Sequence, residues 1–312
     1  MLILDFEKPI FELEAKIKEL KSLNTGDLSI IEEVKRLESK QKKLLKKIYA
    51  DLSPWQKVLV ARHQDRPHTS DYINALIENF ISLAGDRCFG NDPAITAGIG
   101  KFRGISVAVI GHEKGKDTEG RMKHNFGMPH PEGYRKACRI IELADKFRLP
   151  LLTFIDTAGA YPGVGAEERG QAEAIAKCLE TLLNFHNPVV ATIIGEGGSG
   201  GAVALAVADK IFMLEHSIYS VISPEGCASI LYRSAEKASE AAEALKLTSK
   251  DLLQFKMIDE IIEEPLGGAH RDPASMIKSV GDKIKSALLT LNDGEISDFK
   301  KHRNEKFLAL CR

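Results

Sequence analysis

The first sixty residues carry apolar side chains at the spacing of amphipathic helices. Between residues 6 and 62 these side chains recur every three or four positions, and Lys and Glu fill the intervening positions. The polar residues 24–27 separate two such helices. The stripes predict either a surface pair of helices that covers a neighbouring core or an arm for oligomerisation. The pattern does not distinguish these two, because an apolar stripe does not specify the surface it meets.

After the polar stretch 64–69 the pattern changes to short β-branched runs alternating with helical segments. Residues 95–102 and 105–110 read as a hairpin that turns at Arg103 and Gly104. Further strands are expected at 151–155, 189–194, 210–214 and 258–262, and helices at 70–82, 131–147, 166–184, 202–208, 235–245 and 272–291, while the segments 218–223 and 249–256 are not assigned. Such alternation predicts an α/β fold with right-handed βαβ units.

This pattern divides the chain into three parts. We expect a helical segment over 1–65, which would serve assembly if it is an arm, an α/β domain over 66–271, and over 272–312 a C-terminal helix followed by a charged tail that is partly disordered.

Composition narrows the class of protein. The chain has 312 residues, a net charge of −1 and 44% hydrophobic residues, so it can bury a large core and gives no reason to expect a nucleic-acid or membrane partner. Its five cysteines are scattered without a C-x-x-C pair, which argues against a disulfide framework or a zinc site. The N-terminus lacks the features of a signal peptide, and no apolar run is long enough to span a membrane. We therefore expect a cytoplasmic protein.

The most informative stretch is 189–209, VVATIIGEGGSGGAVALAVAD. A buried strand is followed by five glycines within 195–201 and then by a short helix of small apolar residues. Glycines permit positive φ and close approach of main-chain N–H groups, and a helix N-terminus favours an anion. The stretch therefore predicts a site that holds negative charge.

Three interpretations of this turn are possible. Gly195, Gly197 and Gly200 match G-x-G-x-x-G, but the helix is short for a dinucleotide fold and Glu215 lies too near to bind the ribose. The glycines could instead serve only tight packing between strand and helix. The third interpretation is an oxyanion hole formed by the amides of Gly200 and Gly201.

Several segments carry a resemblance to a known family. The stretches DTAGAYPGVGAEERGQAEAIA (156–176), GEGGSGGAVALAVADK (195–210) and YSVISPEGCASIL (219–231) resemble the α subunit of bacterial acetyl-CoA carboxylase carboxyltransferase. So do LDFEKPIFELEAKI (4–17), NFGMPHPEGYRKA (125–137) and EPLGGAHRDP (264–273). One departure is Ala158, where the family usually has proline.

The resemblance implies a crotonase-like fold, a spiral of ββα units with an N-terminal helical extension, and half of an active site. It implies a β subunit in an α₂β₂ assembly that binds most of the acetyl-CoA and carries a zinc ribbon, so no metal is expected in this chain. A biotin carboxyl carrier protein brings carboxybiotin, made by biotin carboxylase. In the family's mechanism, CO₂ is released and the biotin enolate, held by Gly200 and Gly201, removes a proton from acetyl-CoA, which then attacks CO₂ to give malonyl-CoA for fatty acid synthesis.

The remaining candidate residues are expected to bind substrate. They are Gly197 and Gly198 in the turn, Tyr161, Pro162, Gly163 and Gly165 in the loop 156–165, and Lys114 in the basic loop 111–126. Side chains in the turn region suggest neither a Ser-His-Asp set nor paired carboxylates, as expected if biotin is the base. Alternative functions are a decarboxylase or carboxylase of another acyl-CoA, and a non-catalytic scaffold.

Overall fold

The computed structural model describes residues 3–22, 28–293 and 298–310. Its centre is an eight-stranded sheet in the order β1-β2-β3-β4-β5-β6-β8, with β7 paired to the end of β5. The strands are β1 (Ile77–Ser82), β2 (Ile95–Phe102), β3 (Ile105–His112), β4 (Leu151–Thr157), β5 (Val189–Gly198), β6 (Lys210–Leu214), β7 (Ile218–Ser220) and β8 (Glu260–Ile262). The first three pair antiparallel and the rest parallel, so the sheet is mixed.

The predicted hairpin is confirmed. β2 and β3 pair in full register from Phe102 opposite Ile105 to Ile95 opposite His112. Arg103 and Gly104 connect them with φ of 48° and 86°. Positive φ at both central residues is the geometry that matches the twist of a two-residue hairpin.

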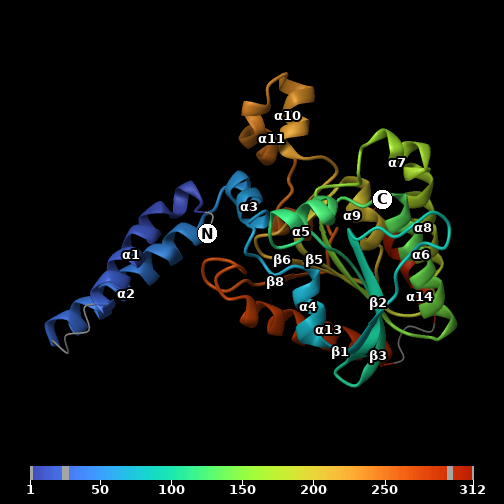
Figure 1. Cartoon of the computed structure of the whole chain (residues 1–312), viewed down its shortest axis with the longest axis horizontal. Coiled ribbons are helices and arrows are strands. Elements are labelled where there is room, and N and C mark those ends of the chain that lie inside the picture. The colour runs from blue at the N-terminus through green and yellow to red at the C-terminus, as the bar shows by residue number, and fades with distance from the viewer. Residues whose placement is uncertain (1–2, 23–27, 294–297, 311–312) are drawn as a thin grey trace.

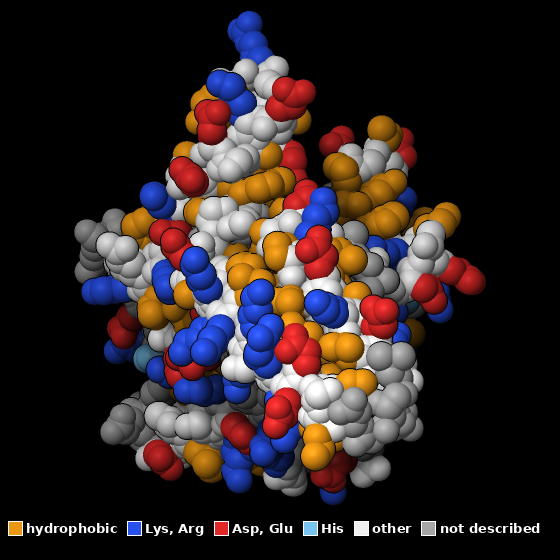
Figure 2. Space-filling model, turned by 90° about the vertical axis from the view of Figure 1, so that its left-hand side faces the viewer, with side chains coloured by type: hydrophobic (Ala, Val, Ile, Leu, Met, Phe, Trp, Pro, Cys, Tyr) orange, Lys and Arg blue, Asp and Glu red, His pale blue; other side chains and the backbone are white. Residues whose placement is uncertain are grey.

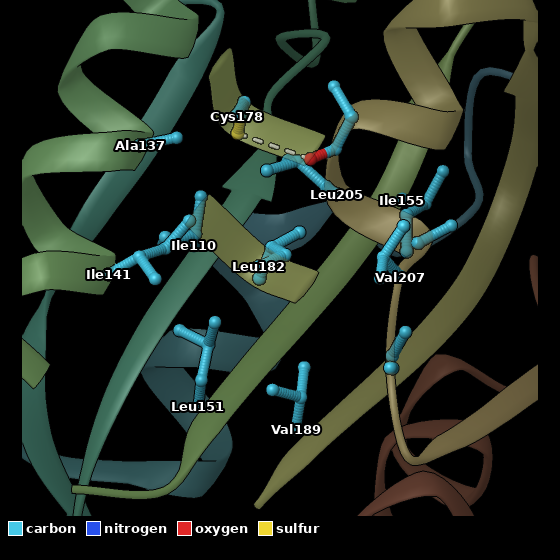
Figure 3. Packing of buried hydrophobic residues seen from close by; sticks show 14 of the residues in the cluster. Ile110, Ala137, Ile141, Leu151, Ile155, Cys178, Leu182, Val189, Leu205 and Val207 are labelled. Carbon is cyan, nitrogen blue, oxygen red and sulfur yellow. Dashed lines mark hydrogen bonds between the residues drawn. The ribbon is translucent and has the colours of Figure 1, made fainter. Parts of the chain in front are cut away.

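Helices cover both faces of the sheet (Figure 1). The α-helices that follow the N-terminal pair in the described residues are α3 (Pro54–Ala61), α4 (Thr69–Leu76), α5 (Thr118–Lys123), α6 (Pro131–Lys146), α7 (Val164–Glu168), α8 (Gln171–Asn184), α9 (Ser199–Ala206), α10 (Pro224–Tyr232), α11 (Ala238–Ala244), α12 (Ser249–Gln254), α13 (Pro273–Asn292) and α14 (Phe299–Ala309). Of these, α10 and α11 stand away from the sheet (Figure 1). On one face α6, α8 and α9 enclose a core that includes Ile110, Ile141, Leu151 and Leu205 (Figure 3). On the other face α4 and α13 enclose a second core. Strands β4 and β5 are buried along their whole length, which explains their continuous apolar runs.

The N-terminal pair consists of α1 (Lys8–Ser22) and α2 (Leu28–Ala50), which project from the body (Figure 1). Ile17, Val34 and Leu37 pack between the two helices, so much of the apolar stripe is used within the pair. Near the body, Leu45 and Val60 join a cluster that attaches the pair to α3. The side of the molecule towards which the pair projects carries both basic and acidic side chains (Figure 2). A role as an assembly arm remains a prediction, and residues 24–27 lie outside the described residues.

Outside the glycine turn, several predictions were wrong in part. The helix expected over 70–82 ends at Leu76, and the chain continues as edge strand β1, because pairing with β2 outweighs local helical spacing. The helix expected over 166–184 is broken at Gly170, whose φ is 81°. The charged tail includes α14, which is anchored on α8 through the fully buried Arg303.

Candidate functional site

Two segments meet at the carboxyl ends of β4 and β5, the edge where open α/β sheets bind ligands. One is the loop after β4 and the other is the glycine turn between β5 and α9. A Cβ on Gly198 would lie 2.2 Å from the carbonyl oxygen of Ala158, and one on Gly201 would lie 2.7 Å from the carbonyl carbon of Gly159. Both positions therefore require glycine so that the two backbones can approach each other.

The turn differs from the prediction in its backbone. β5 continues through Gly198 instead of ending at Ile194, and α9 begins at Ser199 instead of Ala202. Among the described residues 195–201, positive φ occurs at Ser199 (51°) and at none of the glycines. The prediction that the glycines supply positive φ was wrong, and their role here is close approach.

The start of α9 presents main-chain donors. Its N-cap residue, Gly198, provides no side-chain cap, and first-turn N–H groups have no acceptor four residues earlier in the helix. Gly200 is half-buried and Gly201 is buried. A Cβ on Gly200 would meet only the Ile175 side chain, at 3.6 Å. Adjacent donors at a helix N-terminus favour a negatively charged oxygen.

The other predicted substrate-binding residues lie on both sides of this junction. Gly197 pairs with Tyr219, and a Cβ there would lie 2.9 Å from the Tyr219 ring. The Tyr161 ring packs against that of His130, with centroids 4.3 Å apart. Gly163 is the N-cap of α7, and a Cβ there would lie 2.3 Å from the Tyr161 ring. The exposed Pro162 and the half-buried Gly165 complete the predicted set; a Cβ on Gly165 would lie 3.1 Å from Arg169.

A network of charged side chains lies at the same sheet edge. Lys114 Nζ lies 2.7 Å from Asp156 Oδ1 and 3.5 Å from Glu196 Oε2. The amide N–H of Glu196 also donates to Asp156 Oδ1, at 2.9 Å. We name Lys114, Asp156 and Glu196 the charge bridge. Both carboxylate side chains are about 5–7% exposed.

Further charged groups extend the charge bridge at both ends. Arg62 donates to Glu196 Oε1 at 2.8 Å and to Glu225 Oε1 at the start of α10. At the other end, His68 Nδ1 lies 3.5 Å from Asp156 Oδ2.

Mutual attraction favours the ionised forms of Asp156 and Lys114 despite their burial. Burial alone would raise the pKa of Asp156, but Lys114 and His68 hold that pKa well below its ordinary value. Burial alone would lower the pKa of Lys114, but Asp156 and Glu196 raise it. The expectation of no paired carboxylates in this region was wrong. Asp156 and Glu196 lie forty positions apart in the chain, and one partly buried lysine contacts both.

A cavity of about 200 Å³ opens beside the charge bridge. Its lining includes Ala158 from the loop after β4, Arg62 at the end of α3 and His68 at the start of α4. Arg121 and Phe126 also line it; the basic segment 111–126, expected to be a loop, contains α5, on which Arg121 lies. Ala158, the departure from the family's proline, therefore faces this cavity.

Two alternative kinds of site receive no support from this geometry. Within the described residues, no three His, Cys, Asp or Glu side chains are grouped to hold a metal ion. The Glu215 carboxylate, the candidate ribose ligand, accepts a hydrogen bond from the amide N–H of Glu264 at 3.3 Å.

Among helices in the described parts of the chain, none is long and apolar enough to cross a membrane.

Comparison with known proteins decides the family. Residues 3–311 match the model of the family described as acetyl co-enzyme A carboxylase carboxyltransferase-like. The chain belongs to this family. It is 58% identical over 313 residues to the acetyl-coenzyme A carboxylase carboxyl transferase subunit alpha of Paramagnetospirillum magneticum, covering 100% of this chain and 99% of the relative. It is also 58% identical to the protein of the same name from Rhodospirillum centenum, covering 99% and 98%. The chain is a carboxyl transferase, and its curated relatives do not favour the alternative of another acyl-CoA.

Solved structures confirm the crotonase-like carboxyltransferase fold. Transcarboxylase 12S superposes with a TM-score of 0.61 at 17% identity, over 80% of this chain and 48% of that one. The β subunit of geranyl-CoA carboxylase from P. aeruginosa gives 0.56 at 16% identity, over 80% and 48%. A Pseudomonas malonate decarboxylase heterodimer chain gives 0.57 at 13% identity, over 70% and 89%. At these identities the likeness speaks for the fold alone.

Proposed function

We propose that this chain provides one half of a carboxyltransferase site that moves a carboxyl group from carboxybiotin to acetyl-CoA, with the amides of Gly200 and Gly201 as its oxyanion hole. The observation that supports this most directly is the close junction of Gly201 with the loop 158–160, which fixes the start of α9 beside a second backbone segment. Full-length identity to curated carboxyl transferase α subunits supports the reaction.

The chemistry suits main-chain donors. An oxygen that gains negative charge during carboxyl transfer is stabilised by fixed N–H groups, which need no reorganisation during the reaction. The donors also lie where the partial positive charge of α9 is greatest. Carboxybiotin itself supplies the carboxyl group and, once that group has left, the base, so this chain's task is to hold and orient the charged oxygen.

The partners belong to the same proposal. A β subunit, in an α₂β₂ assembly, would complete the site and bind most of the acetyl-CoA, and a biotin carboxyl carrier protein loaded by biotin carboxylase would deliver carboxybiotin. Zinc is expected only in the β subunit. Gly197, Gly198, Tyr161, Pro162, Gly163 and Gly165 shape this chain's half of the site, and the reaction takes place in the cytoplasm.

Reconstitution tests this function. Malonyl-CoA formation is measured for the purified chain alone, for the β subunit alone and for the mixture, with carboxylated carrier protein and acetyl-CoA. We expect activity only in the mixture. Appreciable turnover by this chain alone would contradict a shared site, and a panel of acetyl-, propionyl- and malonyl-CoA would expose a preference for another reaction.

A further inference from the structure

The charge bridge joins the two segments that form the proposed oxyanion site. Asp156 is the penultimate residue of the buried strand β4, and Thr157 alone separates it from the loop that contains Ala158 and Gly159. Glu196 lies in β5, directly before Gly197 and the turn. Lys114, from the loop after β3, contacts both carboxylates, at 2.7 and 3.5 Å.

The positions of the two carboxylates matter because the register between β4 and β5 shifts there. β4 and β5 pair in continuous register from Leu151 opposite Val189 to Ile155 opposite Ile193, and the register then shifts before Thr157 pairs with Gly197. Asp156 lies within this irregularity, where the regular ladder of backbone hydrogen bonds is interrupted. In its place Asp156 Oδ1 accepts the Glu196 amide N–H and the Lys114 ammonium.

The burial of the charge bridge makes it sensitive to the loss of one member. Removal of one charge from a buried group leaves the opposite charge uncompensated, which costs far more than the loss of an exposed pair. The Lys114 side chain is 16% exposed, and the two carboxylates less. A chain without the Lys114 ammonium must therefore protonate, hydrate or displace Asp156, whereas Glu196 keeps its ion pair with Arg62.

We propose that Lys114 is a positioning residue for carboxyl transfer: its ammonium holds Asp156 and Glu196 together and thereby sets the distance between the loop 158–160 and the Gly200–Gly201 amides. This assigns Lys114 a role through other residues, in place of the direct contact with substrate that the sequence predicts. The inference rests on the proposed function.

Exchange of Lys114 for methionine separates the two roles. Lys114→Met keeps most of the apolar stem and removes the charge. In the complex with the β subunit, kcat for malonyl-CoA formation falls at least about tenfold, since misplacement of about 1 Å at a reacting centre costs about 10² in rate. KM for acetyl-CoA changes less than about twofold. A raised KM with an unchanged kcat would instead show direct substrate binding and overturn the proposal.

Hydrogen exchange provides a readout independent of activity. We expect Lys114→Met to accelerate amide exchange in residues 157–160 and 197–201, while exchange in β2, which serves as the internal reference, stays as in the wild type. In the activity assay, Lys114→Arg keeps a cation beside the cavity and recovers at least half of the kcat that Lys114→Met loses. The double variant Lys114→Met with Asp156→Asn is more active than the product of the two single effects predicts, because it removes both members of a pair. Additive effects, or exchange rates equal to wild type in both segments, would refute coupling through the charge bridge.

A matched control removes an ordinary ion pair. Lys177 pairs with Glu180 at 2.8 Å on the exposed surface of α8, so Lys177→Met leaves kcat and exchange unchanged. The activity of the wild-type complex separates a failure of the proposed function from a failure of the positioning role of Lys114. An inactive wild-type complex contradicts the proposed function, whereas an active one with unaffected Lys114 variants contradicts only the positioning role.

Discussion

Arg303 offers the clearest test of how the C-terminal segment is held. Its guanidinium is fully buried and donates to the carbonyl oxygens of Leu182 and Phe185 at 2.8 Å and of Asn187 at 2.9 Å. It also pairs with the Asp209 carboxylate at 2.7 Å. That carboxylate in turn accepts the amide N–H of Val189, the first residue of β5. The helix α14 is therefore connected to the strand that leads to the glycine turn.

The loss of stability expected on removing Arg303 follows from the burial of both Arg303 and Asp209, whose side chains are 0% exposed. Removal of one partner of a buried pair costs about 3–5 kcal/mol, because the other charge remains uncompensated. We therefore expect Arg303→Met to lower the free energy of unfolding by about 4 kcal/mol. At about 2 °C per kcal/mol for a chain of this size, the melting temperature falls by about 8 °C.

Calorimetry and urea unfolding of the purified chain measure this change. The control is Lys301→Met, on the same helix, whose side chain is 72% exposed and lies 3.9 Å from Glu305, and its effect stays within about 0.5 kcal/mol. The double variant Arg303→Met with Asp209→Asn loses less than the sum of the single losses. A loss below about 1 kcal/mol for Arg303→Met would refute the view that this buried pair anchors α14.

Three further predictions concern strain, pH and the acidic limit of stability. Ser199 has a φ of 51°, a backbone conformation that residues with a Cβ adopt at an energetic cost. Ser199→Gly therefore leaves the melting temperature unchanged or raises it, and Ser199→Val lowers it. Equal melting temperatures for the two variants would contradict strain at this position. Burial lowers the pKa of His112 from 6.5 to about 4, so between these pH values the unfolded chain binds a proton that the folded chain does not, and the free energy of unfolding falls as the pH falls from about 6.5 to about 4. His112→Gln should flatten this fall, and an unchanged slope would contradict the assignment to His112. Burial alone would raise the pKa of Glu264, but Arg66 lowers it to about 2, so the stabilisation from this pair is complete above about pH 4.5 and disappears as the pH falls towards 2. The Glu264→Gln chain therefore has a lower free energy of unfolding at pH 7 and loses less of it on acidification. Parallel curves of unfolding free energy against pH for the two proteins would contradict this.

Local patterns predict the elements of the sheet well. The buried runs at 151–155 and 189–194 become β4 and β5, and Arg103-Gly104 forms the expected two-residue turn. Such elements are specified by neighbouring residues, either through burial on both faces or through turn geometry. Segment 77–82 was mispredicted because its strand depends on β2, a partner that local helical spacing does not reveal.

The candidate site was predictable to a lesser extent. The glycine turn is visible in the sequence because backbone approach needs glycine at Gly198 and Gly201. The charge bridge is not visible, because Lys114, Asp156 and Glu196 come from three separate strand ends and their ion pairs exist only after the sheet has formed. Likewise, the positive φ at Ser199 belongs to a serine where sequence patterns favour glycine.

The central claim is that the amides at the start of α9 hold the charged oxygen, and a pair of alanine variants tests it most directly. A Cβ at Gly201 would be forced against the backbone of Gly159 and Ala160 at 2.7 and 2.8 Å, whereas one at Gly200 would make an ordinary contact of 3.6 Å with Ile175. In the complex with the β subunit, we expect Gly201→Ala to lower kcat for malonyl-CoA formation by about 10²–10³, the cost of losing one oxyanion donor, and Gly200→Ala to lower it only a few-fold. A Gly201→Ala complex that assembles normally and turns over at the wild-type rate would contradict the account.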